Sequence, residues 1–170
     1  MPRPLDPPYP EAAVRRIAHL PLWIGTARDA RDLRGVLDAG IEAVVDLAVD
    51  EPPVQPTREL AYLRFPLVDG GGNPHRRVVA ASAAVERLIR LEVPTLVACG
   101  GGMSRSVAIT AAGLCLATDQ RAPDMVLRRI TRDTPVDVHP ALWNEVMNCF
   151  TTDVEQNRFR DDRTTDEGPT

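Results

Sequence analysis

The chain has 170 residues, with 24 acidic and 20 basic side chains and a net charge of -4. This length suits one domain in which helices cover a central sheet. The slightly negative balance gives no broad basic surface, so neither nucleic acid nor an anionic membrane is expected as a partner.

The three cysteines, Cys99, Cys115 and Cys149, lack the paired spacing of a disulfide framework or of zinc ligands. We therefore expect free thiols in a reducing cytoplasm. The first residues lack the apolar run of a signal peptide, and no segment is long enough to cross a bilayer. The sequence predicts a cytoplasmic protein that uses no metal ion and no cofactor.

Short apolar segments of strand length alternate with longer segments in which apolar residues recur at helical spacing. A proline-rich arm is predicted at residues 1–12, one domain at 13–150 and a polar tail at 151–170. Strands are predicted at 14–20, 22–25, 41–47, 61–68 and 95–98. Helices are predicted between Asp29 and Gly40, from Pro74 to Leu91, from Ser106 onward, from Pro123 to Pro135 and from Pro140 to Phe150.

Local signals predict how two of these helices begin and end. Asp29 is expected to cap the first helix, and Gly40 to follow its last turn. Asn73 is expected to cap the next one, with Pro74 at the first helical position. Strands separated by helices favour an α/β fold with a central, mostly parallel sheet flanked by helices. In such sheets the ligand site lies beyond the carboxyl ends of the strands.

The loop after the strand at 95–98 is the strongest candidate for a functional site. It reads Cys99-Gly100-Gly101-Gly102-Met103-Ser104-Arg105-Ser106 and leads directly into an alanine-rich helix. The N–H groups of a glycine-rich loop and of a first helical turn can form a cup for a tetrahedral oxyanion. Cys99 and Arg105 lie at its two ends, so a bound phosphate would meet a nucleophilic sulfur and a guanidinium fork.

This loop resembles that of the dual-specificity branch of the cysteine-dependent protein tyrosine phosphatases, which reads His-Cys-x-x-Gly-x-Ser-Arg-Ser. Every fixed position matches except the first, where this chain has Ala98. A cysteine six residues before an arginine is weak evidence alone, but the strand before it, Gly102 and the two flanking serines make the match specific. The alternative is a glycine-rich turn with a buried structural cysteine.

The resemblance implies a phosphatase that hydrolyses phosphorylated Tyr, Ser or Thr side chains of proteins through a cysteinyl-phosphate intermediate. Cys99 would attack phosphorus, the amides of the loop and Arg105 would bind the phosphate, and Ser106 would stabilise the departing thiolate. The family takes its general acid from an aspartate on an upstream loop, and Asp69 is the only aspartate between Glu51 and Cys99.

The segment Asp69-Gly70-Gly71-Gly72-Asn73 permits two interpretations. Its glycines would let an acid loop hinge over a substrate. An ordinary surface turn is the alternative that such a composition usually indicates. Asp50 and Glu51 also follow a strand, where an acid can orient Arg105, but a solvated turn is the preferred interpretation there. His75, near a helix start, is interpreted as incidental.

Ala98 is the main departure from the resembled family, whose histidine at this position supports the loop and stabilises the thiolate. We therefore expect reduced rather than absent activity. A catalytically silent phosphate-binding domain is the first alternative. A sulfurtransferase of the rhodanese kind is the second, although that family's loop lacks the Ser-Arg-Ser ending. Because the loop contains no lysine, a singly phosphorylated side chain is favoured as the substrate over inositol phospholipids or RNA triphosphate ends.

Overall fold

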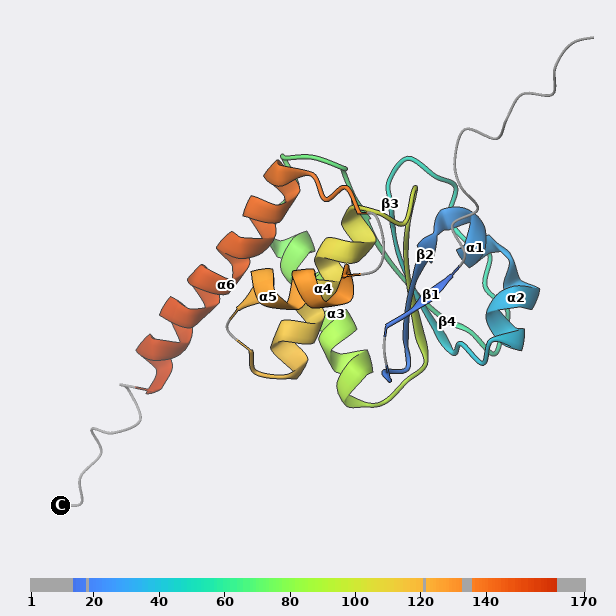
Figure 1. The fold of residues 1–170 in the computed structure, drawn as a ribbon, viewed down its shortest axis with the longest axis horizontal. Coiled ribbons are helices and arrows are strands. Elements are labelled where there is room, and N and C mark those ends of the chain that lie inside the picture. The colour runs from blue at the N-terminus through green and yellow to red at the C-terminus, as the bar shows by residue number, and fades with distance from the viewer. Residues whose placement is uncertain (1–13, 18, 121, 133–135, 162–170) are drawn as a thin grey trace, which may run out of the picture.

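The computed structural model describes residues 14–17, 19–120, 122–132 and 136–161, with 151–161 as helical backbone only (Figure 1). The strands are β1 (Arg15–Arg16), β2 (Leu22–Thr26), β3 (Ala43–Ala48), β4 (Ala61–Leu67) and β5 (Thr95–Cys99). The helices are α1 (Ala27–Arg31), α2 (Leu33–Asp38), α3 (His75–Arg90), α4 (Arg105–Ala117), α5 (Pro123–Ile130) and α6 (Pro140–Asp161). The helix predicted from Pro123 to Pro135 ends earlier, at Ile130, and residues 131 and 132 form a turn. The arm at 1–12 lies outside the described residues, so the predicted division into arm, domain and tail stays a prediction.

The sheet has five strands in the order β1-β2-β5-β3-β4. β2, β5, β3 and β4 run parallel to one another, and β1 pairs with β2 in the antiparallel direction. The predicted α/β fold with a central, mostly parallel sheet flanked by helices is confirmed. Because β5 lies in the middle, its carboxyl end at Cys99 is surrounded by the ends of the neighbouring strands.

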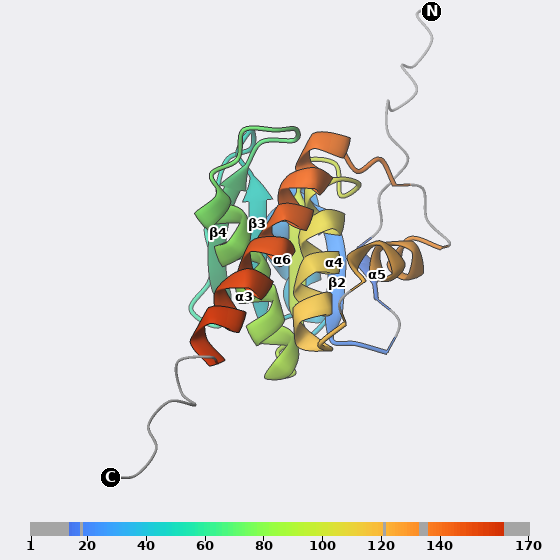
Figure 2. The ribbon, with the colours of Figure 1, turned by 90° about the vertical axis from the view of Figure 1, so that its left-hand side faces the viewer.

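Helices cover both faces of the sheet. Figure 1 shows α1 and α2 on one face and α3, α4, α5 and α6 on the other. Figure 2 shows α6 lying over α3 and α4, which pack tightly against each other. A Cβ atom at Gly113 on α4 would lie 2.5 Å from Val85 Cγ1 on α3, so this helix crossing requires a glycine. None of the helices in the described ranges is long and apolar enough to span a bilayer.

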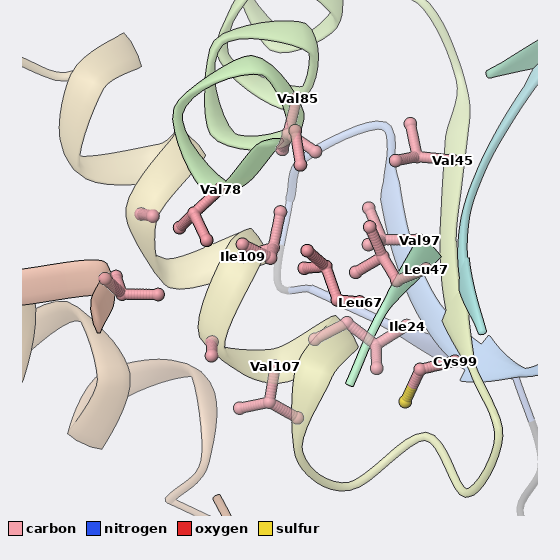
Figure 3. Close-up of a cluster of buried hydrophobic side chains, with 14 of the residues drawn as sticks. Ile24, Val45, Leu47, Leu67, Val78, Val85, Val97, Cys99, Val107 and Ile109 are labelled. Carbon is pink, nitrogen blue, oxygen red and sulfur yellow. The ribbon is translucent and has the colours of Figure 1, made fainter. Parts of the chain in front are cut away.

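The main core lies between the sheet and the layer of α3, α4 and α6. Its side chains are mostly aliphatic, and Figure 3 shows Cys99, at the end of β5, at the edge of this cluster. They include Ile24, Val45, Leu47, Leu67, Val78, Val85, Val97, Val107 and Ile109. Burial of this apolar surface holds β5 and α4 in place, and these two elements carry the Cys99 loop between them.

The first two helices begin where side chains satisfy their free N–H groups, but not where we predicted. Thr26, not Asp29, caps α1: its hydroxyl accepts from the Asp29 N–H at 3.1 Å, while the Asp29 carboxylate accepts from the Thr26 N–H at 2.8 Å. This is a capping box, so Asp29 belongs to the first turn. Asp32 caps a second short helix. Gly40 follows α2 with a φ of +71°, which confirms its predicted place.

Asn73 does not cap α3, contrary to the prediction. Pro74 precedes the helix without any side-chain cap. The buried side chain of Asn73 turns instead toward the loop before it, where its Oδ1 accepts from the Val68 N–H at 2.8 Å. The residue therefore organises the Asp69 loop rather than the helix.

Candidate active site

The loop from β5 to α4 has the backbone that an oxyanion cup requires. Gly102 has a φ of +69°, and a Cβ atom there would lie 3.1 Å from the carbonyl oxygen of Gly25, so only glycine fits. Within the described ranges, no N–H group from Gly101 to Ser106 donates to a backbone carbonyl. These are the donors expected for a bound phosphate.

Cys99 lies at the bottom of this loop. Its side chain is buried, with 1% exposure, and Figure 3 shows the sulfur within the curve of the loop. The Sγ atom is 3.2 Å from the Oγ atom of Ser106, which is fully buried on the first turn of α4. A hydroxyl in this position can donate to a thiolate. Burial raises the pKa of Cys115 to about 11, in keeping with an inert core thiol.

Arg105 is buried, with 3% exposure, and most of its guanidinium donors are used. Nη1 donates to the Asp50 carboxylate at 2.5 Å and to the Leu67 carbonyl at 3.0 Å, and Nη2 lies 3.4 Å from the second oxygen of Asp50. The Nε atom is buried and has no hydrogen-bond partner within the described part of the chain. A buried donor of this kind normally has an acceptor, and a phosphate oxygen in the loop would supply one.

Asp50 lies in an exposed turn, as preferred in the sequence analysis, but it also orients Arg105, which was the less favoured interpretation. Its side chain is 60% exposed, yet both carboxylate oxygens face the guanidinium. The hydrogen bond from Arg105 lowers the pKa of Asp50 below its ordinary value. Burial lowers the pKa of Arg105, but the hydrogen bond to Asp50 and the charges of Cys99, Asp50 and Asp69 outweigh burial and raise it.

A buried polar cluster of Asp46, Tyr62 and Arg64 supports the Asp50 loop, and the sequence analysis missed it. Tyr62 donates to Asp46 at 2.6 Å, and Arg64 Nη1 donates to the same carboxylate at 3.1 Å. Arg64 Nη2 donates to the carbonyls of Ala48 and Glu51 at 2.8 and 2.9 Å. Burial and the bond to Asp46 raise the pKa of Tyr62, which keeps the phenol a neutral donor. The available signal was Asp46, an aspartate inside the strand predicted at 41–47.

Ala98 lies on β5 directly beside this cluster. It is fully buried and pairs in register with Asp46 on β3 and Gly25 on β2. It packs in a second apolar cluster with Val44 and Leu96. Its methyl group offers no hydrogen bond to the loop, so the polar support near this position comes from the neighbouring strands.

Asp69 meets the Cys99 loop through Ser104. The Ser104 hydroxyl donates to Asp69 Oδ1 at 2.5 Å and accepts from the His139 N–H at 3.1 Å. The structure thus brings Cys99, Arg105, Ser106 and Asp69 together at the carboxyl ends of β4 and β5. The main-chain N–H of His139 is an unpredicted member of the site, because no sequence motif includes this residue.

The remaining predicted phosphate-binding residues form the rim of the loop. Gly101 is exposed, and a Cβ atom there would meet nothing within 4 Å. A Cβ atom at Gly100 would lie 2.8 Å from Arg105 Nη2. The Met103 carbonyl accepts from the Asp137 N–H at 3.2 Å. His75 lies elsewhere, with its Nδ1 atom 3.5 Å from Cys149 Sγ.

Two surface hollows lie along α1, α2 and the loop after β3, and neither is lined by Cys99 or Asp69. In the part of the chain that the structure describes, no three His, Cys, Asp or Glu side chains are grouped closely enough to hold a metal ion. The groups that the described residues place at the Cys99 loop are the loop amides, the Cys99 sulfur, Arg105 and, through Ser104, the Asp69 carboxylate.

Sequence comparison finds no match for this chain: no family model matches, and no curated protein matches either. Comparison of structures does find relatives of the fold. A mouse putative dual-specificity phosphatase, crystallised with zinc tungstate, is 24% identical with a TM-score of 0.72, and the match covers 89% of this chain and 94% of that one.

Other solved structures agree. Human DUSP28 is 24% identical with a TM-score of 0.68, over 84% of this chain and 99% of that one. The human tyrosine phosphatase-like serine/threonine/tyrosine-interacting protein is 16% identical with a TM-score of 0.66, over 83% and 97%. At these identities the likeness establishes the fold, and the fold of this chain is that of the dual-specificity phosphatases.

Proposed function

We propose that this protein is a phosphomonoester hydrolase that acts on a phosphorylated Tyr, Ser or Thr side chain through a cysteinyl-phosphate intermediate. The observation that carries the proposal is the meeting of two loops. The Cys99 sulfur lies in one loop with the Nε atom of Arg105, which has no partner among the described residues, and an exposed carboxylate, Asp69, is hydrogen-bonded to that loop by Ser104.

In the first step the loop amides and Arg105 hold the phosphate. Its charge spreads over the equatorial oxygens in the transition state, where these donors bind it most strongly. The Cys99 thiolate attacks phosphorus in line and forms the S–P bond while the ester P–O bond breaks. Asp69 gives its proton to the leaving oxygen, which departs as a hydroxyl group.

In the second step water attacks the cysteinyl phosphate and gives its proton to the Asp69 carboxylate. The S–P bond breaks, inorganic phosphate forms and Cys99 returns as a thiolate. The Ser106 hydroxyl, 3.2 Å from the sulfur, stabilises that thiolate by donating a hydrogen bond. Asp69 acts as acid and then as base, and the cycle ends with its proton restored.

The rim of the loop favours a substrate with a single phosphate. Gly100 and Gly101 bring no cation, while the exposed carboxylates of Asp50, Asp69 and Asp137 lie on or beside the loop. A second phosphate on the substrate would meet negative charge rather than positive charge. We therefore expect singly phosphorylated peptides to be hydrolysed faster than an inositol phospholipid carrying several phosphates.

The test compares the wild-type protein with Cys99→Ser and Asp69→Asn on para-nitrophenyl phosphate and on a phosphotyrosine peptide, over a pH series. Cys99→Ser should abolish turnover but still bind tungstate. Asp69→Asn should slow the chemical step and change the pH–rate profile, while KM stays near its wild-type value. Full turnover by Cys99→Ser would refute the role of the sulfur, and an unchanged pH profile would remove Asp69 from its role.

A catalytically silent phosphate-binding domain is the second candidate, and Ala98 is the observation that favours it. The buried methyl group of Ala98 can neither donate nor accept a hydrogen bond, so the loop beneath Cys99 has less support than in a phosphatase with a histidine at this position. The pH dependence of Cys99 alkylation separates the two candidates. A midpoint near that of a free thiol, with phosphopeptide binding and no hydrolysis, would support the silent domain. Asp69 argues against sulfur transfer, because that reaction needs no general acid.

A further inference from the structure

A second anchor holds the Asp69 loop from the opposite side, on α6. The Glu145 carboxylate accepts from the Gly72 N–H at 2.5 Å, from the Asn73 N–H at 3.2 Å and from the Asn73 side chain at 2.9 Å. These three donors all belong to the loop between Asp69 and α3. Figure 1 shows the start of α6 beside this loop.

The loop is also tied to itself through Asn73. This side chain is buried, with 8% exposure, and its Nδ2 atom lies 3.1 Å from the carbonyl oxygens of Val68 and of Gly70, the two residues that flank Asp69. Its Oδ1 atom accepts from the Val68 N–H at 2.8 Å. Asn73 thus fixes the backbone on both sides of the acid, and Glu145 fixes Asn73.

The helix that carries Glu145 is itself rigidly placed. Leu142 and Val146, on either side of Glu145, are fully buried in the main core. The backbone of the loop lies against the first turn of α6, since a Cβ atom at Gly71 would be 3.3 Å from the Cβ atom of Ala141. Here glycine allows close packing of the loop on the helix, which differs from the hinge suggested by the sequence.

We infer that Glu145 is a positioning residue for the general acid: through Asn73 and the Gly72 amide, it holds the loop so that Asp69 faces the Cys99 site. This inference rests on the proposed function. The Asp69 carboxylate then has two fixed neighbours, the Ser104 hydroxyl on the Cys99 loop and the tethered backbone of its own loop. The acid is in place before a substrate binds, so its proton transfer needs no large loop movement.

The test uses leaving-group dependence, which a merely structural role would not change. Phenyl phosphate needs a proton on its leaving oxygen, because phenolate is a poor leaving group. Dinitrophenolate, the leaving group of dinitrophenyl phosphate, departs readily without a proton. Glu145→Ala should lower kcat/KM, which reports only the first step, about 10- to 100-fold on phenyl phosphate, at or below the roughly 10²- to 10⁴-fold that general acid catalysis supplies, because Asp69 itself remains. It should change kcat/KM on dinitrophenyl phosphate less than about threefold, as should Asp69→Asn, because the later hydrolysis step, in which Asp69 acts as the base, does not enter kcat/KM. Asn144→Ala, an exposed neighbour on the same helix, is the matched control and should match the wild type on both substrates.

Glu145→Gln is the conservative variant. Its carbonyl oxygen can still accept from the Gly72 and Asn73 N–H groups, although its amide nitrogen cannot accept from the Asn73 side chain. It should therefore recover part of the kcat/KM on phenyl phosphate while keeping the wild-type fold by circular dichroism. Equal losses on both substrates in Glu145→Ala, or no loss on either, would overturn the inference while leaving the proposed hydrolase intact. Absence of turnover by the wild-type protein on both substrates would overturn the proposed function and this inference with it.

Discussion

Replacing Arg64 by methionine tests whether the polar cluster under the Asp50 loop supports the site. The side chain of Asp46 is 3% exposed, and that of Arg64 is 23% exposed. Methionine fills the space of the Arg64 stem but removes four hydrogen bonds, to Asp46, Tyr62 and the carbonyls of Ala48 and Glu51. The variant leaves a buried carboxylate without its cation.

The expected loss of unfolding free energy depends on which hydrogen bonds Asp46 retains in the variant. Removing one partner of a buried ion pair costs about 3–5 kcal/mol. Because the Tyr62 hydroxyl and the Ala48 N–H still donate to Asp46, the lower end applies, about 3 kcal/mol of unfolding free energy. In a chain of this size, each kcal/mol lowers Tm by about 2–4 °C, so Tm should fall by roughly 6–12 °C.

Calorimetry and urea unfolding of Arg64→Met, Asp46→Asn and the double variant measure this loss. The double variant should regain part of the stability lost in Arg64→Met, because no buried charge is left unpaired. Tungstate affinity of Arg64→Met should also fall, since the two carbonyls that Arg64 binds flank Asp50, the partner of Arg105. A loss below about 0.5 kcal/mol, the usual effect of a surface substitution, would refute this reasoning.

Three further outcomes are expected. Iodoacetamide at neutral pH should modify Cys99 before Cys115, whose pKa is raised by burial to about 11, and tungstate should protect Cys99; equal rates would contradict the site. The folded pKa of Asp50 lies below its unfolded value because of Arg105, so its contribution to stability is present above the unfolded pKa and is lost as pH falls through the folded one. Asp50→Asn should therefore flatten the acid limb of Tm against pH. Gly113→Ala should cost about 1–3 kcal/mol in urea unfolding by overpacking the crossing of α3 and α4.

The loop around Cys99 was predictable because its signals are local. A buried strand, a run of glycines and a helix start follow one another in sequence. The strand order then places β5, with the loop at its carboxyl end, in the middle of the sheet. The sheet followed from the same alternation of strands and helices. The predicted cap at Asp29 was wrong by three residues and the one at Asn73 by one, because a polar side chain near a helix start can bond other backbone groups instead of the free N–H groups of the helix.

The residues that support the site were not predictable, because they are far apart in sequence. Asp50 is 55 positions from Arg105, and Asn73 is 72 positions from Glu145. The sequence raised a contact of Asp50 with Arg105 but did not favour it, and it offered no partner for Glu145, since an acid after a strand and an acid on a helix are both common on solvated surfaces. These groups come into contact only because α6 and the loop after β3 both pack against the site.

Phosphate binding and thiolate activation have separate supports in this molecule. Arg105 is held by Asp50, whose loop is fixed by Arg64, and these contacts do not involve position 98. The sulfur, in contrast, has the Ser106 hydroxyl and the loop amides but no polar side chain at Ala98 beneath it. Loss of the histidine found in similar loops should therefore weaken nucleophilic attack more than oxyanion affinity. We therefore expect kcat to fall further than tungstate affinity when both are compared, on one preparation of this protein, with the values of a phosphatase that has the histidine.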